Sequence, residues 1–201
     1  RFDPLVGRVV EGYALLQPRV TPTLPTDREG SLFQRIFSGP GGIDPYASAV
    51  SDVYQDLFGE GSYIGKGIYD IDAFEAALAG RVPENTLLSH DLFEGIFARA
   101  GLATDIEFFD EFPWHYAIAA ARQHRWARGD WQLLPWILGH APDANSDRVR
   151  TKIPAISRWK LLDNLRRTLL APAAFLILII GWTLPFASPS IWTAFVLVTF
   201  A

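Results

Sequence analysis

The residues best suited to chemistry lie in one short stretch, residues 122–132, which holds three arginines and two tryptophans. A guanidinium group matches phosphate oxygens in bidentate geometry, and an indole face stacks on a sugar ring. Asp91 lies about thirty residues upstream, and its carboxylate is a candidate general base. Together these residues predict a site for an anionic substrate that carries a sugar.

Transfer of a sugar from a nucleotide donor needs a cationic clamp for the diphosphate, a carboxylate for the proton of the attacking hydroxyl, and an aromatic platform. The clamp is predicted to be Arg122, Arg125 and Arg128, because the first two are three residues apart and share one helix face. Trp126 and Trp131 are the predicted platform, and Asp91 is the predicted catalytic base.

A glycine-rich loop, residues 59–67, is the second candidate for substrate contact. It holds four glycines together with Ser62, Tyr63 and Lys66. Glycine permits close approach of the backbone to a ligand. We expect Ser62 and Tyr63 to bind substrate, although a plain surface turn has the same composition.

Metal-binding signals are weak in this chain. The pair Asp70 and Asp72 has Asp-x-Asp spacing, but it lies at the start of a predicted helix. The histidines at 115, 124 and 140 are too scattered for a metal site. We therefore assign no metal ligand. Residues 89–91, Ser-His-Asp, also fit a simple helix cap, with Ser89 as the N-cap.

The elements that must position these residues alternate between strand and helix. The predicted strands cover residues 12–17, ending at Pro18, and residues 103–109. The predicted helices cover residues 31–37, 45–58, 68–78, 92–100, 116–126 and 160–167. This alternation is typical of an α/β fold.

Length and charge narrow the class of protein. Its 201 residues suffice for one domain, and the formal charge of -4 argues against a general nucleic-acid binder. The chain has no cysteine, which excludes disulfides and thiolate metal sites. It begins with Arg1 and contains no methionine, so we expect an internal piece of a longer protein.

The C-terminal part indicates a membrane. Residues 168–201 carry no charge, whereas residues 148–167 contain seven basic residues and one acidic residue. A bilayer-spanning helix needs about 20 apolar residues, which residues 168–187 supply before a second apolar block begins. The basic run predicts that residues 1–167 are cytoplasmic. A buried hairpin of a soluble protein is the alternative.

Three short motifs resemble a known group of enzymes. Arg122-x-x-Arg125-Trp126 resembles the (Q/R)xxRW motif of processive membrane glycosyltransferases such as the cellulose and hyaluronan synthases. Asp91 stands where those enzymes carry the catalytic base of an acidic pair, although His90 here replaces the first acid. Gln17 begins a segment similar to their Gln-x-Pro strand end near the acceptor, which implies that Gln17 binds substrate.

Four longer phrases resemble the cyclic β-1,2-glucan synthases and cover about residues 10–140: LQPRVTPTLP, GEGSYIGKGIYDIDAFE, VPENTLLSHDLFEG and AARQHRWARGDWQLLPWILG. The resemblance implies a hexosyltransferase with a GT-A-type domain that uses UDP-glucose, inverts the anomeric carbon and extends a growing β-glucan. It also implies a multi-pass protein of the bacterial inner membrane and a divalent metal, Mg or Mn. The metal ligands are expected outside this chain.

These expectations divide the chain into three parts. Residues 1–147 are the acceptor and catalytic half of the transferase domain, residues 148–167 a basic interface segment, and residues 168–201 a transmembrane helix and the start of a second in the lipid bilayer. We expect this piece alone to be inactive. A synthase of another β-glucan such as cellulose, or a non-catalytic membrane scaffold that binds carbohydrate, stays open.

Overall fold

The computed structural model describes residues 1–23, 30–38, 52–88, 91–186 and 188–200. The chain divides into two compact units, Arg1–Leu161 and Leu162–Ala201. The first unit contains β1 (Phe2–Asp3), β2 (Arg8–Val9), β3 (Leu15–Thr23), α1 (Leu32–Phe37), α3 (Val53–Phe58), β4 (Ile68–Tyr69), α4 (Ile71–Leu78), α5 (Asp91–Ala98), β5 (Ala100–Glu111), α6 (Tyr116–Gln132), α7 (Leu134–Ile137), β6 (His140–Pro142) and β7 (Arg148–Arg150). Helix α8 (Ala155–Thr183) begins in the first unit and continues into the second, which also holds α9 (Pro189–Phe200).

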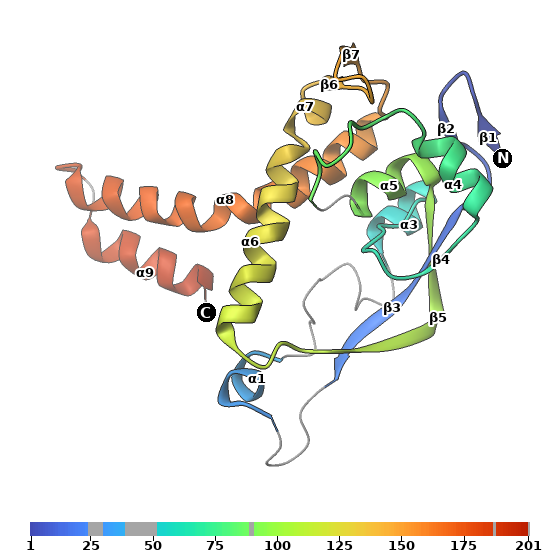
Figure 1. Cartoon of the computed structure of the whole chain (residues 1–201). Coiled ribbons are helices and arrows are strands. Elements are labelled where there is room, and N and C mark those ends of the chain that lie inside the picture. Colours follow the sequence, from blue (N-terminus) through green and yellow to red (C-terminus); the bar gives the residue numbers. More distant parts are fainter. Residues whose placement is uncertain (24–29, 39–51, 89–90, 187, 201) are drawn as a thin grey trace. The chain divides into compact units, whose positions relative to one another are not determined.

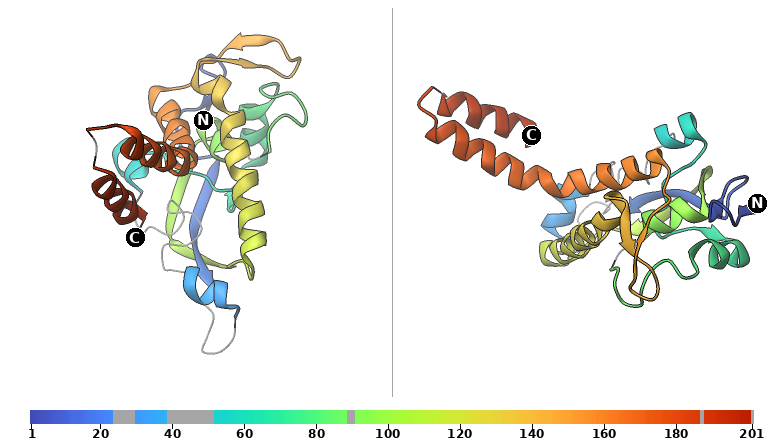
Figure 2. Two further views of the ribbon diagram at one scale, coloured as in Figure 1. Left: turned by 90° about the vertical axis from the view of Figure 1, so that its left-hand side faces the viewer. Right: turned by 90° about the horizontal axis from the view of Figure 1, so that it is seen from above.

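The chain is a mixed α/β protein with small sheets, as its sequence predicts. The largest sheet described has the strand order β4-β3-β5, in which β3 is antiparallel to β4 and parallel to β5 (Figure 1). β3 and β5 are its two long strands, and they lie side by side in both views of Figure 2. The chain between them forms α4 and α5, among other elements, so this segment returns to the sheet beside β3.

Strand β3 is longer than the sequence predicts. The expectation that Pro18 ends the strand was wrong, because β3 continues to Thr23. After Leu16, the residues of β3 pair with β5 and have no described partner in β4, so one edge of this part of the strand is unpaired in the described sheet. Proline lacks an N–H and is tolerated at such an edge or at a bulge. The register between β3 and β5 indeed shifts between Pro18 and Arg19.

Residues 68–78 form a short strand followed by a helix rather than one helix. Ile68 and Tyr69 pair with β3, and this pairing overrides their local helical spacing. Asp70 is the N-cap of α4, and its carboxylate accepts a hydrogen bond from the Ala73 N–H at 2.9 Å. The prediction that this Asp-x-Asp pair marks a helix start is therefore confirmed.

The remaining helices differ from prediction mainly at their ends. Ser89, the proposed N-cap of α5, and His90 lie outside the described residues. The first half of the predicted helix 45–58 lies outside them too, and its end is present as α3. Helix α6 begins at the predicted Tyr116 and runs to Gln132, beyond the predicted end at Trp126.

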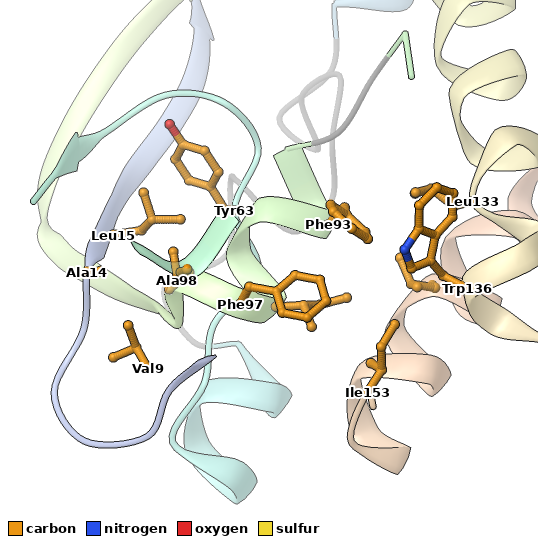
Figure 3. Close-up of a cluster of buried hydrophobic side chains, with 14 of the residues drawn as sticks. Val9, Ala14, Leu15, Tyr63, Phe93, Phe97, Ala98, Leu133, Trp136 and Ile153 are labelled. Atoms are coloured by element: carbon orange, nitrogen blue, oxygen red, sulfur yellow. The ribbon is translucent and has the colours of Figure 1, made fainter. Parts of the chain in front are cut away.

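The core of the first unit packs α5 between the sheet and α7 (Figure 3). Phe93 and Phe97 of α5 are buried, and the Phe93 ring meets Trp136 edge-on with ring centroids 5.2 Å apart. Leu15 of β3 is fully buried in the same cluster. Asp91 is the first residue of α5, so this packing fixes the helix that carries the proposed base.

The second unit is a pair of apolar helices. The Trp182 indole N–H donates to the Thr193 hydroxyl at 2.9 Å, which joins α8 to α9. A Cβ at Gly181 would lie 2.6 Å from the Cβ of Trp192, so this glycine permits the close approach. Among the described helices, α8 alone is long and apolar enough to cross a membrane, and α9 is shorter.

Candidate active site

A cavity of about 400 Å³ in the first unit collects most of the charged residues singled out above. Strand β3, the glycine-rich loop, α5, the end of β5 and α6 all contribute to its wall. The lining residues are Val20, Pro22, Ile64, Gly65, Lys66, Asp91, Asp110, Arg122, Arg125 and Trp126. Three of these side chains are cationic and two are carboxylates, so the cavity suits a ligand with both anionic and hydroxyl groups.

Helix α6 supplies one wall of the cavity through a single face. Arg122, Arg125 and Trp126 are spaced i, i+3 and i+4, which places them on adjacent turns of one side. The Arg122 guanidinium carbon lies 5.9 Å from the centroid of the Trp126 ring. Arg128 and Trp131 are exposed and do not line the cavity. The structure thus brings two of the three predicted clamp arginines to the site.

Asp91 lines the same cavity as these arginines. Its carboxylate lies against the backbone of Gly65, where an added Cβ would be 2.7 Å from Asp91 Oδ2. Gly65 also has a φ of +83°, a conformation that other residues rarely adopt. The glycine therefore leaves open the space in which the Asp91 carboxylate lies.

The glycine-rich loop reaches the cavity through residues other than the predicted ones. Ser62 is buried, and its backbone N–H donates to the Asp52 carboxylate at 3.2 Å. Tyr63 belongs to the hydrophobic core (Figure 3). Burial and the nearby Glu94 and Asp91 carboxylates raise the pKa of the Tyr63 phenol above its ordinary value. Neither Ser62 nor Tyr63 lines the cavity.

Gln17 supports this loop and does not line the cavity. It is fully buried, and its side-chain carbonyl accepts a hydrogen bond from the Ile64 N–H at 3.0 Å. Its amide N–H donates to the Pro18 carbonyl at 2.8 Å. A buried amide with both ends paired fixes its neighbours, because breaking either bond leaves a polar group unsatisfied. Gln17 therefore holds the cavity-lining Ile64 against β3.

Lys66 and Asp110 are the two charged lining residues that were not predicted from the sequence. Their side chains form an ion pair and are 40% and 41% exposed. The composition of the loop and of the acidic end of β5 was visible in the sequence. The parallel register of β3 and β5 was not visible in the sequence. It pairs Asp110 with Pro22, which also lines the cavity.

The described part of the chain offers no metal centre. No group of three or more histidine, aspartate or glutamate side chains in it could hold a metal ion. The cavity has two carboxylates, one of which is paired with Lys66. The described residues therefore do not fit a resident divalent metal on their own, and the metal stays a prediction.

Comparison with known proteins gives one informative relative. The chain is 53% identical over 180 residues to the cyclic beta-(1,2)-glucan synthase NdvB of Rhizobium meliloti (strain 1021). This match covers 90% of the chain but only 6% of the length of that relative. No family model matches the sequence. The resemblance predicted from the four phrases is confirmed, over a short segment of a much longer protein.

Proposed function

We propose that this chain forms the acceptor and catalytic half of a GT-A-type domain in a membrane-bound, inverting glucosyltransferase. The enzyme polymerises glucose from UDP-glucose into a β-1,2-glucan. The observation that carries this proposal is that one cavity contains Asp91 together with Arg122, Arg125 and Trp126. Identity of 53% to a cyclic β-1,2-glucan synthase supports the choice of product.

The proposed reaction is a single displacement at the anomeric carbon of glucose. Asp91 accepts the proton from an acceptor hydroxyl as its oxygen forms a bond to that carbon. The bond between the carbon and the diphosphate oxygen breaks, and UDP leaves with the electron pair. Attack opposite the leaving group converts the α-linkage of the donor into a β-linkage in the glucan.

Arg122 and Arg125 are proposed to bind the diphosphate as negative charge develops on it. Donors that are already oriented toward a developing charge stabilise the transition state without reorganisation. Trp126 lies next to Arg122 and offers an apolar face to the acceptor sugar. The divalent metal that the resemblance implies would add positive charge at the diphosphate, with ligands outside the described residues.

The second unit is proposed to be membrane-embedded. Residues 168–201 contain no charged side chain, and α8 is long enough to span a bilayer. The seven basic residues in 148–167 favour a cytoplasmic location for the transferase part, where UDP-glucose is available. Such an arrangement delivers the growing glucan toward the bacterial inner membrane.

Replacing Asp91 by Asn in the full-length protein tests the proposed function. We expect glucose transfer to fall by about 10³-fold, since general-base catalysis contributes on the order of 10²–10⁴-fold. UDP-glucose binding, measured by calorimetry, should stay within about threefold, because the isosteric amide leaves the arginine face unchanged.

Two results would contradict parts of this proposal. Normal transfer by the Asp91→Asn protein removes Asp91 from catalysis, and unchanged glucan content in cells with that variant favours a non-catalytic scaffold. Linkage analysis of the product checks the polymer, because β-1,4 linkages would identify a synthase of another glucan such as cellulose.

A further inference from the structure

Lys66 is held in the cavity by contacts on both sides of it in the chain. The Ile64 N–H donates to the buried Gln17 carbonyl at 3.0 Å, and Gly65 lies against Asp91. A Cβ at Gly67 would collide with the carbonyl oxygen of Leu16, so this residue lies directly on β3. The backbone that carries Lys66 is therefore fixed relative to both the sheet and the proposed base.

The partner of Lys66 is Asp110, near the end of β5. Both residues line the cavity, and their ion pair is about two-fifths exposed. Such a pair contributes only about 0–1 kcal/mol to stability. A gain in folding stability is therefore too small to explain why this ion pair lies in the same cavity as Asp91, Arg122 and Arg125.

The pair presents both kinds of hydrogen-bonding group to a ligand. An ammonium group has three donors and no acceptor, and an ionised carboxylate only accepts. A sugar hydroxyl does both, so two neighbouring hydroxyls can accept from Lys66 and donate to Asp110. The planar forks of Arg122 and Arg125 suit phosphate oxygens better than a lysine neutralised by Asp110 does.

We propose that Lys66 and Asp110 bind the terminal sugar of the acceptor and turn its reacting hydroxyl toward Asp91. The inference rests on the proposed glucosyl transfer and assigns its acceptor subsite. Gly65, the residue before Lys66, lies against the Asp91 carboxylate, and the ion pair lines the same cavity as Asp91, so a sugar bound by the pair can turn a hydroxyl toward this carboxylate. The donor diphosphate then occupies the α6 side of the cavity.

Steady-state kinetics of the full-length enzyme test this assignment with Lys66→Met, Asp110→Asn and the double variant. The probes are UDP-glucose and an added β-1,2-linked glucotriose. We expect each single variant to raise the KM for the triose about tenfold, the equivalent of about 1.4 kcal/mol. The KM for UDP-glucose should change by less than about twofold. The double variant should resemble the single ones, because the two side chains act as a pair.

Glu107→Gln is the matched control. Glu107 of β5 pairs with Arg19 of β3 at 3.3 Å, and neither residue lines the cavity. Successive residues of a strand point to opposite faces, so Arg19 lies on the other face from Val20. This control loses a similar ion pair and should keep both KM values.

The results separate this inference from the proposed function. If Lys66→Met raises the KM for UDP-glucose and leaves that for the triose unchanged, Lys66 binds the diphosphate and the assignment is wrong. Wild-type kinetics in both single variants, with Asp91→Asn inactive, also overturn it while the proposed function stands. If Lys66→Met does not fold, as judged by thermal unfolding, Lys66→Gln is measured against the same criteria.

Discussion

Helix α6 and the glycine-rich loop both line the cavity, but different interactions decide which of their side chains reach it. On α6 the regular turn of the backbone places Arg122, Arg125 and Trp126 together and leaves Arg128 outside. In the loop, contacts with residues far away in the sequence expose Lys66 and bury Ser62. Local periodicity therefore defines the helical wall, whereas tertiary contacts define the loop wall.

The largest loss of glucose transfer is expected from a substitution on the α6 face that lines the cavity. Arg125→Lys keeps the positive charge but loses the planar fork, so transfer should fall on the order of 10²–10³-fold. Arg128→Lys makes the same chemical change on a residue that does not line the cavity, and its effect should be below tenfold. Turnover numbers of the two full-length variants check this comparison. Equal losses of turnover in the two variants would show that transfer does not depend on whether the arginine lines the cavity.

A variant that displaces the glycine-rich loop should have the next largest effect on the transfer rate. Gly67→Ala places a methyl group against the Leu16 carbonyl and must shift the loop. A displacement of about 1 Å can reduce a rate on the order of 10²-fold, and here we expect a loss of tenfold or more.

Gly61→Ala is the control for this loop variant. A Cβ at Gly61 would lie 3.2 Å from Gln55 Oε1, so this side chain, which accepts from the Leu102 N–H and does not line the cavity, has to give by only a few tenths of an ångström. Its transfer rate should stay near that of the wild type. If both alanine variants are equally active, the contact between Gly67 and Leu16 does not position the site.

The smallest effect is expected from Ser62→Ala, although the sequence favoured this residue for substrate contact. The bond from Ser62 to Asp52 uses the backbone N–H, which alanine retains. We expect the transfer rate to change by less than about twofold. A tenfold rise in the KM for UDP-glucose or acceptor would show that the hydroxyl reaches substrate after all.

The sequence was informative where one short segment determines geometry. The spacing of Arg122 and Arg125 predicted that these two arginines share a helix face, because a helix repeats every 3.6 residues. It also placed the start of α6 at Tyr116 and the pair Asp70 and Asp72 at the start of a helix. These features depend on neighbours within a few residues.

The sequence was less informative where distant segments meet. The continuation of β3 through Pro18 depends on which edge of the strand is paired, and the burial of Tyr63 depends on the core. The ion pair between Lys66 and Asp110 depends on the loop contacts and on the register of β5. None of these follows from residue types or spacing.

The most direct test of the central claim is an electron cryo-microscopy structure of the full-length protein with UDP and a β-1,2-linked gluco-oligosaccharide bound. We expect the diphosphate to lie against Arg122 and Arg125, and a terminal hydroxyl to lie within about 2.6–3.2 Å of the Asp91 carboxylate. The other hydroxyls of that sugar should contact Lys66 and Asp110. An oligosaccharide bound in another place, with its reacting end remote from Asp91, would contradict the account.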